Sequence, residues 1–65
     1  MARSKYVIDV LAYSDESKKS RVMIWADNKS DVVGIDDDWD TGSILWDITA
    51  KQLYILNSRA EWIAQ

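Results

Sequence analysis

The chain has 65 residues, a formal net charge of −3, and neither Cys nor His. This length allows one domain with a small core, and without Cys or His we expect neither a disulfide nor a zinc site. Because His is also the side chain that most often performs acid–base catalysis at neutral pH, we predict that the protein is not an enzyme and uses no cofactor.

The N-terminal part of the chain is predicted to form a β-hairpin. Residues 1–4 are a short, flexible polar tail, and residues 5–27 hold two apolar segments separated by a polar stretch at 14–20. Neither segment has a sustained helical period, and both contain β-branched and aromatic residues. We therefore expect two strands joined by an exposed turn.

Residues 28–41 are predicted to be an irregular acidic connection, with a short helical turn capped by Ser30 or Asp31. Six Asp residues lie in the 17-residue span 31–47, which contains no Lys or Arg, whereas the rest of the chain has eight basic and five acidic residues. Such a loop suits a partner with a basic patch. The residues of this predicted acidic docking loop are Asp36, Asp37, Asp38 and Asp40.

The alternating Asp residues of this loop also invite comparison with a Ca²⁺ site, in which such side chains supply oxygen ligands. The sixth position of a Ca²⁺-binding loop should be Gly but is Thr41, and the twelfth should be a bidentate Glu but is Asp47. We therefore favour a solvated acidic loop and predict no metal site.

Residues 42–65 are predicted to form a three-stranded antiparallel meander. Apolar runs at 42–48, 53–56 and 61–64 are separated by polar breaks of hairpin length at 49–52 and 57–60. The register that follows from four-residue loops aligns Trp46, Ile55 and Trp62 in one row, which we take as the core. Ile44, Ile48 and Leu53 flank this row, and the N-terminal hairpin is expected to cover it.

The fold class is therefore all-β: a small antiparallel sheet or a partly open barrel of about five strands. The second face of the meander would remain apolar, and contiguous exposed apolar surface usually marks an interaction site. We predict that this face makes the protein a homo-oligomer, a dimer or a trimer. The predicted interface residues are Leu45, Tyr54, Leu56 and Ile63, joined by Trp39.

Two other kinds of partner are not expected. No segment approaches the roughly 20 consecutive apolar residues of a membrane span. Trp39 and Trp46 are surrounded by Asp rather than by Lys and Arg, which argues against direct stacking on nucleic-acid bases.

The C-terminal third resembles a segment of small proteins encoded in the head and tail gene modules of tailed bacteriophages. The resemblance rests on a Gly42-Ser43 start with Asp47, on Tyr54 followed by a turn at Asn57-Ser58, and on a closing Trp62. The resemblance implies a structural component of the virion that decorates the capsid or takes part in head and tail assembly. Such a protein would be made in the host cytoplasm and would bind another virion protein. The resemblance implies no catalytic residues.

A second hypothesis is a small acidic inhibitor whose Asp cluster mimics nucleic-acid phosphates and blocks a host DNA-binding protein. Mimics of this kind spread acidic residues over a whole face, whereas here the rest of the chain has more basic than acidic residues. The charge distribution therefore favours the first hypothesis.

Overall fold

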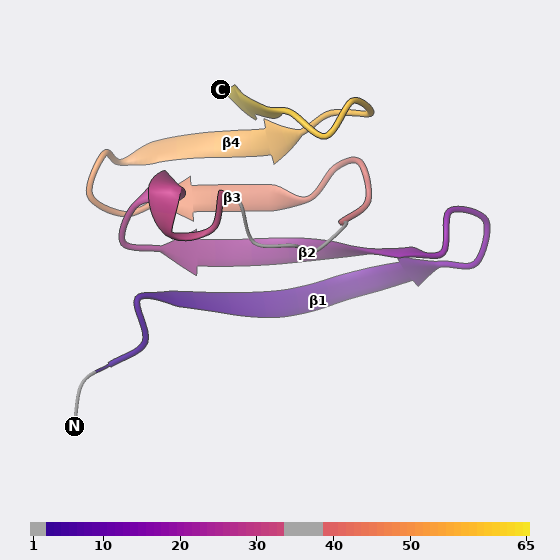
Figure 1. The fold of residues 1–65 in the computed structure, drawn as a ribbon, viewed down its shortest axis with the longest axis horizontal. Helices are drawn as coiled ribbons and strands as arrows, with labels where there is room; N and C mark the ends of the chain where they lie inside the picture. The colour runs from indigo at the N-terminus through magenta and orange to yellow at the C-terminus, as the bar shows by residue number, and fades with distance from the viewer. Residues whose placement is uncertain (1–2, 34–38) are drawn as a thin grey trace.

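The computed structural model describes residues 3–33 and 39–65, whose strands form a single five-stranded β-sheet (Figure 1). Strands β1 (Tyr6–Ser14) and β2 (Lys19–Ala26) form the N-terminal hairpin. Strands β3 (Ile44–Asp47), β4 (Gln52–Leu56) and β5 (Trp62–Ala64) form the meander. The spatial order equals the chain order, so β1 and β5 are the two edges and the sheet does not close into a barrel. The all-β prediction is confirmed.

The pairing of β2 with β3 is parallel, which makes the sheet mixed rather than wholly antiparallel. The other neighbouring strands are antiparallel, as predicted. Because parallel neighbours start at the same end of a sheet, the chain after β2 has to return along the sheet before β3 can begin. The short 3₁₀ helix η1 (Lys29–Asp31) belongs to this return and lies in front of the sheet in Figure 1. The N-terminal hairpin therefore extends the meander's sheet, and our expectation that it covers one face is wrong.

The core lies between this return segment and one face of the sheet, which we call the covered face. Val22, Ile24 and Ala26 of β2, Leu45 of β3 and Val32 of the return segment are each no more than 1% exposed. Half-buried side chains pack around this cluster: Tyr6, Ile8, Trp39, Tyr54 and Trp62.

The register between β3 and β4 differs by two residues from the predicted one. Trp46 pairs with Leu53 rather than with Ile55. The turn closes early because the Asp47 carboxylate accepts the N–H of Ala50 at 2.9 Å, and Lys51 adopts a left-handed φ of 55°. A shift of two residues keeps each side chain on its predicted face of this strand pair.

The register between β4 and β5 differs by one residue, and this moves a tryptophan to the other face. Leu56 pairs with Trp62. The turn includes Glu61, because the backbone N–H of Asn57 donates to the Glu61 carbonyl and the Asn57 side-chain oxygen accepts the Glu61 N–H, both at 2.9 Å. A slip of one residue exchanges the faces of a strand, so Trp62 packs in the covered core while Ile63 points away from it.

A β-bulge in β1 redirects the end of the N-terminal hairpin. Val10 pairs with Val22 but Ala12 pairs with Arg21, which leaves Leu11 as the extra residue. Bulges re-aim the side chains that follow them. Tyr13 is consequently opposite Ser20 and lies toward the covered face.

Buried polar contacts fix the start of β3. Ser43 is fully buried, and its hydroxyl accepts the Val22 N–H at 3.1 Å and donates to the Asp40 carbonyl at 2.8 Å. The preceding Gly42 has a φ of +91°, and a Cβ at this position would lie 3.3 Å from Cδ of Arg21. These contacts attach the end of the return segment to β2.

Leu45→Ala tests the location of the core. Leu45 is fully buried, so we expect the substitution to lower the free energy of unfolding by about 2–5 kcal/mol, most of what a domain of this size supplies. Leu11→Ala, at the exposed bulge, is the control and should change the free energy by no more than about 0.5 kcal/mol. Urea denaturation followed by tryptophan fluorescence measures both variants. Equal denaturation midpoints for Leu45→Ala and the parent would place the core elsewhere.

Ala60→Gly tests the backbone strain in the last turn. Ala60 has a φ of 61°, a conformation that costs a residue with a Cβ roughly 1–2 kcal/mol. After the larger entropy loss of Gly is subtracted, we expect a stabilisation of about 0.5–1 kcal/mol. The control is Ala50→Gly in the preceding turn, where φ is not positive and Gly should be destabilising. Stabilisation by both variants, or by neither, would contradict this explanation.

Candidate protein-binding surface

The side of the sheet opposite the core is lined by apolar side chains, and we call it the open face. Strand alternation and register arrange these side chains in two rows that cross the sheet. One row is Val7, Trp25, Trp46 and Leu53, and the other is Met23, Ile44, Ile55 and Ile63.

Solvent reaches much of this surface. Val7 is 52% exposed, Ile63 is 45% exposed and Trp25 is 39% exposed, and the other five members are half-buried. In the described ranges, 3–33 and 39–65, η1, Val32 and Trp39 all pack on the opposite side of the sheet. Two apolar rows without a covering layer are the arrangement expected of a protein-binding surface.

Charged residues within the strands of the open face lie at its margin. Asp9 pairs with Met23 at the β1 edge, and Arg21 precedes Met23 by two residues in β2. An apolar centre with a polar border is the usual composition of a protein interface.

Most of the residues predicted for the interface lie on the covered face instead of on the open face. Leu45 is fully buried and Leu56 is 5% exposed, both on the covered face. Tyr54 lies under Lys29, whose Nζ is 4.6 Å from the ring centroid. Trp39 packs on the core and against Trp62, with ring centroids 6.3 Å apart. Of the five predicted residues, Ile63 alone belongs to the open face.

Most of the residues predicted for the core lie on the open face. Ile44, Trp46, Leu53 and Ile55 lie on the open face rather than in the interior. Both faces of the meander are apolar in sequence, so alternation identifies two faces without showing which of them is covered. The missed residues Val7, Met23 and Trp25 were recognisable as one face of the hairpin. Their continuation of the meander's face depends on the parallel pairing.

The acidic docking loop lies mostly outside the described residues, which is the case for Asp36, Asp37 and Asp38. Asp40 is described and is half-buried. Its carboxylate accepts the Thr41 N–H at 2.9 Å and the Ser17 hydroxyl at 3.1 Å. Asp40 therefore connects the return segment to the tip of the N-terminal hairpin.

Asp47 is a buried carboxylate with a structural role. One oxygen accepts the Ala50 N–H and the other accepts the Lys29 N–H, each at 2.9 Å. These hydrogen bonds, first Ala50 and then Lys29, with a smaller contribution from Thr49, lower the pKa of Asp47, and burial opposes them only in part. Asp47 thus binds the β3–β4 turn and the beginning of η1 with a single charged group.

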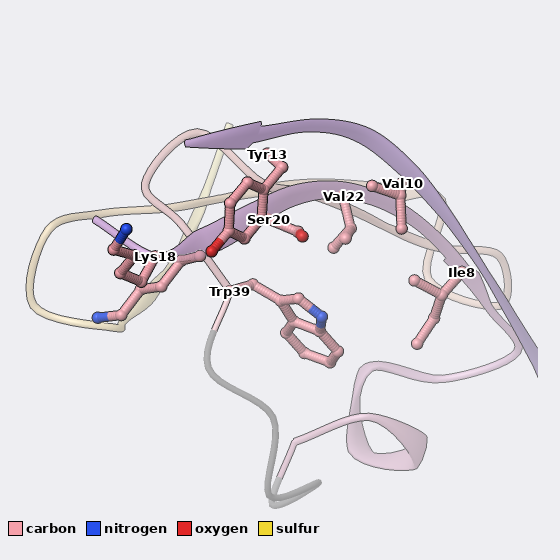
Figure 2. Close-up of a pocket in the computed structure, with 8 residues that line it drawn as sticks. Ile8, Val10, Tyr13, Lys18, Ser20, Val22 and Trp39 are labelled. Carbon is pink, nitrogen blue, oxygen red and sulfur yellow. The ribbon is translucent and has the colours of Figure 1, made fainter. Parts of the chain in front are cut away.

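A groove of about 340 Å³ lies beside the core near the tip of the N-terminal hairpin (Figure 2). Ile8, Val10 and Val22 form its apolar wall, and Tyr13 and Trp39 face each other across it. Lys18, Lys19 and Ser20 complete the lining. The groove is at the lower end of the roughly 300–1,000 Å³ typical of small-molecule sites. Among the described residues, its lining includes no carboxylate that could accept a proton.

The described part of the chain contains neither a metal-binding cluster nor a membrane-spanning helix. Its His, Cys, Asp and Glu residues form no group of three or more that could hold a metal ion. Nor does that part contain a helix long and apolar enough to cross a membrane.

Comparisons of the chain with protein-family models, with curated proteins and with solved structures found no match.

Asp47→Asn tests the role of this carboxylate. An amide has one acceptor oxygen, so it cannot replace both of the carboxylate's bonds, and we expect the melting temperature at pH 7 to fall by several degrees. The hydrogen bonds hold the folded-state pKa of Asp47 below the ordinary aspartate value of 3.8. The carboxylate therefore stabilises the parent fully above about pH 3.8 and loses this effect as the pH falls through the lower, folded-state pKa.

The difference between parent and variant should therefore shrink below about pH 3.8. Thermal melts followed by circular dichroism from pH 7 to pH 2 measure it, and Asp15→Asn at the exposed hairpin tip is the control. A difference that stays constant over this range would show that ionisation of Asp47 is not responsible.

Proposed function

We propose that the chain is a non-enzymatic protein-interaction module that binds through the open face. The observation that carries this proposal is the arrangement of eight apolar residues in two rows on a sheet face that no described element covers. The groove in Figure 2 gives the proposal less support than the open face does. Its described lining residues are apolar or cationic, apart from Ser20 and the Tyr13 hydroxyl, and include no carboxylate.

The cellular setting we propose is a tailed-bacteriophage particle or its assembly. This part rests on the resemblance of residues 42–63 to small head and tail module proteins. These motif residues have structural roles in this chain. Gly42 and Ser43 directly precede β3, Asp47 holds the next turn, and Asn57 closes the last one. A segment whose motif residues make turns suits a structural component of a virion bound to a neighbouring virion protein.

The test is to determine whether the protein is in the particle. Phage particles whose genome encodes the chain are purified by density gradient and analysed by quantitative mass spectrometry. We expect a fixed number of copies per particle in the parent phage. Particles carrying Val7→Glu and Ile63→Glu should lose the protein, whereas those carrying the control Val10→Glu, on the other side of β1, should keep it.

Two results would contradict the proposal. If purified particles lack the parent protein, the virion setting is wrong. If the free protein instead retains a host DNA-binding protein, and DNA or the triple substitution of Asp36, Asp37 and Asp38 by Asn releases it, the acidic-inhibitor hypothesis is correct.

A further inference from the structure

We infer that the open face is covered by the open face of a second copy, so that two sheets form a symmetric β-sandwich. This inference rests on the proposed function, in that it identifies the first partner of the same surface. Two identical faces that meet around a twofold axis form an isologous interface, in which each residue is used twice. Sheets stacked in this way lie about 10 Å apart, with strands aligned within about 30°.

The single chain has a larger accessible surface than a compact monomer of the same mass. The chain exposes 4729 Å², whereas a compact monomer of 7.5 kDa exposes about 4,200 Å². Its radius of gyration is 11.7 Å, against about 10.7 Å for a compact domain of 65 residues. The single-layer sheet and the exposed N-terminal residues 3–5 both contribute to these differences.

The size of the open face fits a copy of itself. Five strands span about 24 Å at their usual spacing, and the eight residues of β2 span about 26 Å. Because β3, β4 and β5 have only four, five and three residues, the face is smaller than the rectangle of these two lengths and covers roughly 450 Å² in projection. A contact over all of it would be smaller than the roughly 800 Å² per partner of a standard interface. A flat apolar partner of the same outline is required to cover it, and a second copy supplies one.

The charges of the face permit this pairing. The chain as a whole has a net charge of −3, which would repel a second copy if the acidic residues were on the contact surface. Lys19 of β2 alternates with Arg21 and lies at the hairpin tip, where it lines the groove. The charged residues that flank the apolar rows directly are Asp9 of β1 and Arg21 of β2. Both lie at the margin, so the apolar rows of two copies can meet without burying charge and without net repulsion.

A matched pair of substitutions in β1 tests the inference. Val7 and Val10 are the same residue type on the same strand and are 52% and 66% exposed, but Val7 is on the open face and Val10 is on the other. Glu at either position should be tolerated by the folded chain, which circular dichroism verifies. Sedimentation equilibrium at micromolar concentration then gives the molecular mass.

We expect the parent and Val10→Glu to sediment at twice 7.5 kDa. Val7→Glu, and likewise Ile63→Glu, should increase the dissociation constant on the order of tenfold or more, because each dimer would bury two unpaired charges. A parent that is monomeric at 100-fold higher concentration would overturn the inference. Dissociation by Val10→Glu but not by Val7→Glu would do the same and would move the contact to the other side of the sheet. A parent that is monomeric in solution but present in the particle would overturn the dimer while leaving the proposed function intact.

Discussion

The parallel pairing of β2 with β3 is the constraint on which the rest of this structure depends. It obliges the chain to return along the sheet between these strands, and in the described residues of this return, 27–33 and 39–43, Val32 and Trp39 lie over β2 and β3. A sheet of five strands in a 65-residue chain has enough remaining residues to cover one face only. The same constraint therefore creates the core, and within residues 3–33 and 39–65 the opposite face has no covering layer.

Polar side chains hold the return segment where this constraint needs it. The Asp47 carboxylate binds the Lys29 N–H at one end of the segment, and the Ser43 hydroxyl binds the Val22 N–H at the other. Both are buried, where a hydrogen bond is costly to lose because the partner would remain unsatisfied. Apolar burial drives the segment onto the sheet, and these two residues determine its position there.

The open face connects this architecture to binding. Val7, Trp25, Trp46 and Leu53 are neighbours only because the hairpin and the meander share one sheet. A chain of this size without a disulfide has a small margin of stability, so covering these side chains with a protein partner adds stability as well as specificity. Folding and association are consequently coupled in the function we propose.

The sequence by itself determined the strand segments to within a few residues and the all-β class, because alternation and turn residues are local signals. It did not determine the length of the two meander turns and hence the strand registers. It left open which face is buried, because both faces of the meander are apolar and alternation treats them alike. Tertiary structure decided this through the side of the sheet on which Val32 and Trp39 pack. The Asn57–Glu61 hydrogen bonds decided the last register, since one additional turn residue places Trp62 in the core and Ile63 on the open face.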